Sequence, residues 1–119
     1  MAYESCGRDQ SQLTIITEHH TRRSVLKLLG ELDLCSSGDL RRAVGTLLEQ
    51  HDPQSLTIDL SGLTFVDCAG LSALVWTRKC LAEQGHKLVI TGSQPLVRRL
   101  LALTGLAMYL GFSADNDNG

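Results

Sequence analysis

The segment Leu56–Ser61 (LTIDLS) alternates strictly between apolar and polar side chains, which makes it the clearest strand signal in the chain. Residues Gly62–Asp67 are expected to lead out of this strand into a helix that Gly85 ends. The helix is indicated by apolar side chains at helical spacing, namely Leu71, Leu74, Val75, Leu81 and Ala82. A strand followed by an amphipathic helix predicts a unit of an α/β sheet.

Similar patterns occur on both sides of this unit. Before it, Gln12–Thr17 and Ser24–Leu32 predict strands, and a helix follows with apolar positions at Leu40, Val44, Leu47 and Leu48. After it come a strand at Lys87–Thr91, a helix at Pro95–Thr104 and a short strand at Ala107–Phe112. The order β-β-α-β-α-β-α-β predicts a mixed, mostly parallel sheet of about 4–5 strands with about 3–4 helices.

Length and composition favour one globular domain. The chain has 119 residues, and we expect residues 12–112 to form the domain, with residues 1–11 and 113–119 as polar tails. Hydrophobic residues make up 43% of the chain, which is enough to build a core. A net charge of −2 and an aromatic content of 4% do not favour direct binding to nucleic acid.

The apolar runs and the N-terminal residues indicate a cytoplasmic protein. No apolar run is long enough to span a bilayer, and the N-terminal residues lack the pattern of a secretory signal, so we expect no membrane contact. The four cysteines, Cys6, Cys35, Cys68 and Cys80, are then expected to be reduced thiols. Their spacing contains no C-x-x-C pair, and we expect neither a metal nor a cofactor.

Residues Asp59–Leu71 (DLSGLTFVDCAGL) closely resemble the central signature of STAS domains. This fold is shared by bacterial anti-sigma factor antagonists and by the cytoplasmic ends of sulfate transporters. Two further stretches agree with the family: Gly30–Asp33 (GELD) is similar to its strand-to-helix turn, and Pro95–Leu106 (PLVRRLLALTGL) to its last main helix. The resemblance covers about residues 13–112 and implies a single STAS domain that regulates transcription through sigma factors, as in bacterial stress responses.

The resemblance also implies how such a protein works. In the family, a Ser or Thr usually follows the signature Asp and is phosphorylated by the partner, an anti-sigma factor of the serine-kinase type. The unphosphorylated antagonist captures this anti-sigma factor and frees the sigma factor. Carried over by position, Asp67 is the signature Asp and Cys68 takes the phosphoacceptor position. Because Ser/Thr kinases do not normally phosphorylate thiols, ordinary control by phosphorylation is not expected here.

The predicted partner-binding surface lies beyond the carboxyl ends of the strands, where functional groups gather in such sheets. It comprises Asp33 from one turn, together with the start of the helix after the other turn, namely Asp67, Cys68, Ala69, Gly70, Leu71 and Ser72. The same residue types also allow plainer roles. Asp67 fits an ordinary helix N-cap, Cys68 a small half-buried side chain, and Asp33 a solvated turn carboxylate.

Several forms of control are compatible with a thiol at this position. One is oxidation of Cys68, with Cys35 as its disulfide partner, since about 18 Å of helix separates Cys68 from Cys80. Another is phosphorylation of a nearby hydroxyl, such as that of Ser61, Thr64 or Ser72. A constitutive antagonist without such control is the third.

Two other functions are alternatives. The same fold would serve as a regulatory STAS subunit of a lipid or anion transporter complex. A thiol-dependent phosphatase or sulfurtransferase is less favoured, because Leu74 stands where a phosphatase loop would need an arginine to hold phosphate. No histidine is placed by the sequence as a base for Cys68. We therefore expect no catalytic residue and no enzyme activity, and the oligomeric state stays open.

Overall fold

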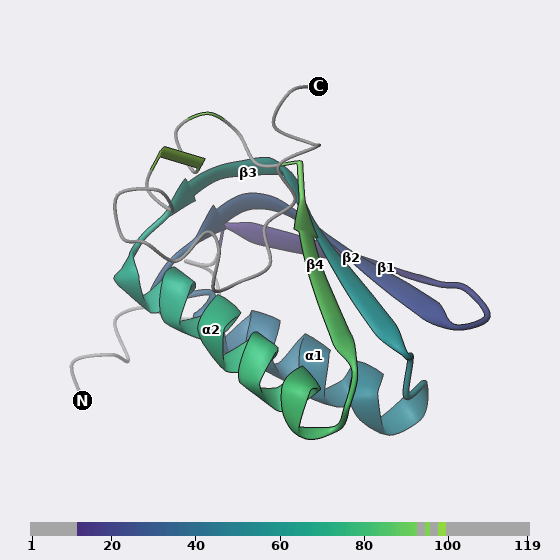
Figure 1. Ribbon diagram of the computed structural model, residues 1–119. Coiled ribbons are helices and arrows are strands. Elements are labelled where there is room, and N and C mark those ends of the chain that lie inside the picture. The colour runs from purple at the N-terminus through teal and green to yellow at the C-terminus, as the bar shows by residue number, and fades with distance from the viewer. Residues whose placement is uncertain (1–11, 93–94, 96–97, 100–119) are drawn as a thin grey trace.

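The computed structural model describes residues 12–92, 95 and 98–99 (Figure 1). Its elements are β1 (Leu13–His19), β2 (Arg23–Leu32), α1 (Ser37–Gln50), β3 (Ser55–Val66), α2 (Cys68–Glu83) and β4 (Lys87–Thr91). This confirms the predicted order up to β4. The described part of the chain thus holds four strands and two helices, fewer helices than predicted. In it, no helix has the length and apolar character needed to cross a membrane.

The predicted third helix and last strand fall largely outside the described residues. Three described residues in that region, Pro95, Arg98 and Arg99, are assigned as helical. The predicted tails at 1–11 and 113–119 also lie outside the described residues.

The sheet is mixed and mostly parallel, as predicted. Its strand order is β1-β2-β3-β4, in which β1 pairs with β2 antiparallel, and β2 with β3 and β3 with β4 pair parallel. Each parallel pair needs a crossover connection, and α1 and α2 supply the two crossovers. Both helices lie against the same face of the sheet (Figure 1).

One hydrophobic core fills the space between this face and the helices. The strands contribute alternate buried side chains to it, including Leu26, Leu28, Leu56, Ile58, Leu60 and Ile90. The helices contribute Leu40, Val44, Leu47, Leu71, Ala73, Leu74 and Leu81. The predicted stripe of α2 is wrong at Ala82, which is exposed, whereas Val75 is half-buried and packs against the core. Thr77 is buried instead, and its hydroxyl donates to the carbonyl of Ala73 over 2.8 Å.

Strand β3 is longer than the sequence pattern indicates. The segment Gly62–Asp67, expected to be a connecting loop, continues the strand to Val66. The register between β2 and β3 shifts between Lys27 and Leu29, and the alternation of buried residues breaks at the same level of β3. A bulge of this kind interrupts the period of two that identifies a strand. This extension carries β3 to the point where α2 begins.

Candidate functional site

Two connections meet at the carboxyl ends of β2 and β3. Leu32 pairs with Val66 at the end of these parallel strands, so the chain leaves both strands at the same edge of the sheet. The N–H of Leu34 donates to Oδ2 of Asp67 over 3.2 Å, and the N–H of Asp67 donates to the carbonyl of Leu32 over 3.2 Å. The structure therefore brings together the two junctions that the sequence placed at this edge.

Asp67 is the N-cap of α2. Its Oδ1 accepts the N–H of Gly70 over 2.9 Å, and its backbone carbonyl accepts the N–H of Leu71 over 2.9 Å. A carboxylate at this position satisfies an otherwise free amide and interacts favourably with the positive end of the helix dipole. Since its other oxygen binds Leu34, one side chain fixes both the start of α2 and the neighbouring turn.

Gly70 allows the first turn of α2 to pack directly on the end of β2. The residue is buried, and a Cβ atom added to it would overlap the carbonyl oxygen of Leu32. The same atom would lie only 2.7 Å from Cγ2 of Val66 and 2.9 Å from Cγ of Leu32. A side-chain-free residue is thus required here by close packing.

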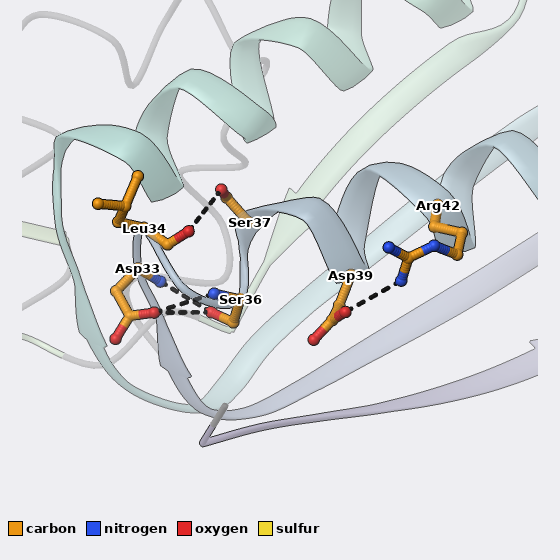
Figure 2. Close-up of polar contacts among 6 residues, drawn as sticks. All are labelled: Asp33, Leu34, Ser36, Ser37, Asp39 and Arg42. Atoms are coloured by element: carbon orange, nitrogen blue, oxygen red, sulfur yellow. Dashed lines mark hydrogen bonds and ion pairs between the residues drawn. The ribbon is translucent and has the colours of Figure 1, made fainter. Parts of the chain in front are cut away.

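The β2–α1 turn is held by hydrogen bonds that involve Asp33 and Ser36 (Figure 2). Oδ1 of Asp33 accepts the N–H groups of Cys35 and Ser36 over 3.0 and 3.1 Å. The buried Ser36 hydroxyl accepts the N–H of Asp33 over 2.9 Å and donates to the carbonyl of Glu31 over 2.8 Å. Asp33 therefore stabilises its own turn rather than being a purely solvated carboxylate.

This network determines how α1 begins. Ser36 is the N-cap residue, but its side chain makes no capping bond to the helix, because its hydroxyl is engaged within the turn. The hydroxyl of Ser37 instead donates to the carbonyl of Leu34 over 3.4 Å (Figure 2). Asp39 in the first turn of α1 forms an ion pair with Arg42 in the second turn over 3.0 Å.

The predicted surface residues divide into an exposed and a supporting group. Cys68 and Ser72 are exposed on the first turns of α2, whereas Asp33, Asp67 and Ala69 are half-buried, and Gly70 and Leu71 are buried. Leu34 is the residue that sequence reasoning missed: it is 63% exposed beside this group. Its only signal was an apolar side chain within a polar turn. We call Leu34, Cys68 and Ser72 the docking face, after the partner-binding surface that the sequence predicts at this edge.

A groove of about 510 Å³ runs along α2 from this face. It is lined by Arg41 of α1 and by Cys68, Leu71, Ser72, Val75, Trp76 and Lys79 of α2. The guanidinium carbon of Arg41 lies 5.7 Å from the centre of the Trp76 ring, within cation–π distance. This pairing joins α1 to α2 and is a tertiary contact that the sequence pattern does not predict.

The cysteines differ in state. Cys68 is an exposed free thiol and Cys80 a half-buried free thiol. Cys35 is disulfide-bonded, and neither Cys68 nor Cys80 is its partner. The structure therefore contains no Cys35–Cys68 bond. The expectation of reduced thiols is wrong for Cys35. Burial raises the pKa of the Cys80 thiol, and the nearby Glu83 carboxylate adds to this rise.

The histidines lie at the other end of the parallel strands. His19 stacks on His51 with ring centres 3.5 Å apart, and His86 binds Asp52 over 2.8 Å. These residues flank the starts of β2, β3 and β4, away from Cys68. Over the ranges that the structure describes, no three potential metal ligands come together. The groups that the docking face offers are a thiol, a hydroxyl and an apolar side chain.

Comparisons with known proteins agree with this geometry. A family model described as "STAS domain" matches residues 14–117. The chain is 31% identical over 94 residues to the anti-sigma-F factor antagonist RsfB of Mycobacterium tuberculosis, covering 79% of this chain and 75% of that protein. It is 31% identical over 94 residues to an anti-sigma-B factor antagonist of Bacillus subtilis, covering 79% and 84%.

A solved structure of a protein with the same kind of name has a similar fold. The crystal structure of an anti-sigma factor antagonist from Mycobacterium paratuberculosis superposes with a TM-score of 0.73 at 30% sequence identity. The match covers 89% of each chain.

A first prediction concerns the close packing at Gly70. We expect Gly70→Ala to lower the free energy of unfolding by about 1–3 kcal/mol, because the added methyl group overlaps the end of β2. The matched control is Gly45→Ala within α1, where an added Cβ meets nothing within 4 Å. That change should raise the free energy of unfolding by about 0.5–1 kcal/mol. Urea denaturation measures both, and equal effects would contradict the packing argument.

A second prediction concerns the thiols. We expect iodoacetamide to alkylate Cys68 about tenfold faster than Cys80 near neutral pH, since Cys68 is exposed and the raised pKa of Cys80 lowers its thiolate fraction. Peptide mass spectrometry gives the rate at each site. Cys68→Ser is the control and should remove the fast phase alone. Equal labelling rates at the two sites would show that the exposure described here is wrong.

Proposed function

The chain belongs to the STAS domain family, and we propose that it acts as an anti-sigma factor antagonist. In this proposal it binds an anti-sigma factor of the serine-kinase type and thereby releases a sigma factor for transcription. The names of the relatives that share about 30% identity with it support this role. Sigma factors act on RNA polymerase, so the proposal places the protein in the cytoplasm. Its mechanism is binding rather than catalysis.

The observation that carries the proposal is the exposure of Cys68 at the start of α2, directly after the signature Asp67. The family resemblance implies that the partner kinase phosphorylates the residue at this position. Here it stands beside the exposed Leu34, and Asp67 bonds to the backbone of both turns. A preformed surface of this kind loses little conformational entropy when a partner binds. The docking face is therefore suited to contact an anti-sigma factor.

The thiol changes how such a protein is controlled. Phosphoryl transfer depends on a substrate hydroxyl that is positioned in line with the γ-phosphate. Cys68 offers a sulfur atom there, so we infer that the partner kinase does not switch this antagonist off at residue 68. The antagonist is then either constitutive or controlled by oxidation of the exposed thiol.

The hydroxyls of Ser61, Thr64 and Ser72 differ in how well they could accept phosphate in place of residue 68. The hydroxyl of Thr64 donates to the carbonyl of Gly30 over 3.0 Å, and Ser61 precedes it on β3. Ser72 is exposed one helical turn beyond Cys68 and belongs to the docking face. Of the three hydroxyls considered, Ser72 is the best placed for a kinase bound there.

The test uses the purified kinase-type anti-sigma factors of the same cell, with the wild-type protein, Cys68→Ser and Cys80→Ser. Without ATP, all three proteins should bind one of these partners with similar affinity in isothermal titration calorimetry. With ATP, only Cys68→Ser should take up phosphate at residue 68 and lose affinity, because it alone has a hydroxyl there. Cys80→Ser carries the same substitution on the same helix and controls for it.

Two results would contradict the proposal in different ways. Wild-type protein phosphorylated at residue 68 would refute the account of the thiol. If none of these anti-sigma factors bound the protein, the proposed function itself would be wrong.

A further inference from the structure

The groove beside the docking face combines apolar side chains with two cationic ones. We infer that it binds an acidic segment of the partner that carries a protruding apolar side chain. This inference rests on the proposed function and names the kind of partner segment that the site takes. It is carried by the shape of the groove, its apolar floor and its cationic rim.

The sequence of α2 creates the groove through a second stripe of residues. The groove positions of α2 fall at i, i+3, i+4, i+7, i+8 and i+11, so they share one side of the helix; they are Cys68, Leu71, Ser72, Val75, Trp76 and Lys79. This stripe lies next to the core-facing side, and Arg41 from α1 closes it at its flank. From Cys68 to Lys79 the helix rises about 16 Å, the length of about five extended residues.

The floor of the groove is apolar. Leu71 is 5% exposed, and the half-buried Val75 and Trp76 pack against the core from the same side. The groove is therefore backed by the core. A volume of about 510 Å³ lies within the range of ligand pockets. An aromatic or branched apolar side chain fits this floor.

The rim of the groove is cationic. Arg41 and Lys79 are both exposed, and among the described residues that line the groove there is no Asp or Glu. Within the described chain neither cation forms an ion pair, although Arg42, next to Arg41, is paired with Asp39. The protein as a whole has a net charge of −2, so this local charge is opposite to the average. By charge complementarity, the groove favours a partner segment that carries carboxylates.

The groove is continuous with the position that defines the family's function. Cys68 and Ser72 belong both to the docking face and to the groove wall. A partner that contacts Cys68 therefore has an adjacent channel along α2 into which a neighbouring segment can extend. Contacts there add specificity for partners with the right charge, independently of phosphorylation.

Trp76 provides a direct readout, because it is the single tryptophan of the chain and lies in the groove. The probes are three short peptides with blocked ends: EDEFDE, its uncharged counterpart QNQFNQ, and EDEGDE without the apolar anchor. Each is titrated into the full-length protein while tryptophan fluorescence is followed. The same titrations are made with the double variant Arg41→Gln and Lys79→Gln. The control is a second double variant, Arg22→Gln and Arg23→Gln, which removes two exposed charges near the β1–β2 hairpin.

We expect a saturable change in tryptophan fluorescence with EDEFDE. The affinities of the other two peptides should be lower by about tenfold or more. The groove variant should lose affinity for EDEFDE to the same extent, and the control variant should bind like the wild type. Equal binding of EDEFDE and QNQFNQ, an unaffected groove variant, or no saturation with EDEFDE at millimolar concentration would each overturn the inference.

The anti-sigma factor itself separates this inference from the proposed function. If an anti-sigma factor binds wild-type protein and the groove variant equally, the inference fails and the proposed function stands. If EDEFDE binds as expected but no anti-sigma factor does, the preference of the groove stands and the proposed function fails.

Discussion

The carboxylate of Asp67 holds together the two turns that carry the docking face. Its two oxygens accept N–H groups from Gly70 and Leu34, which belong to different connections of the sheet. One bond starts α2 and the other holds the β2–α1 turn beside it, so the positions of Cys68 and Leu34 relative to each other follow from a single side chain. Gly70 makes this arrangement possible, because any larger residue would push α2 away from the end of β2.

The physical division of labour within α2 explains how one helix serves both folding and binding. One side carries Leu74 and Leu81 into the core, and the adjoining side presents Cys68, Trp76 and Lys79 to the groove. The core-facing side chains hold the helix in place, and the groove-lining side chains provide the groups that a partner could contact. In the proposed function, the thiol of Cys68 stands where the family usually has the hydroxyl that accepts phosphate. In the proposed function, partner choice then rests on shape and charge.

The sequence predicted the order and type of the elements up to β4 because their apolar periods are regular. It did not predict the extension of β3, since the bulge breaks the period of two after Ser61. The N-cap role of Asp67 and the meeting of the two turns followed from local chemistry and parallel topology. The exposure of Leu34, the stacking of Arg41 on Trp76 and the disulfide at Cys35 depend on contacts between distant residues. Pattern analysis of a single sequence contains no information on such contacts.

The central claim is that the carboxyl end of the sheet and the adjoining side of α2 form the contact surface. Hydrogen–deuterium exchange of the protein with and without its bound anti-sigma factor tests this most directly. The account predicts slower exchange on binding at the amide of Leu34 and along α2 from Cys68 to Lys79. Slower exchange confined to the β1–β2 hairpin and to the region around His51, at the opposite end of the strands, would contradict it.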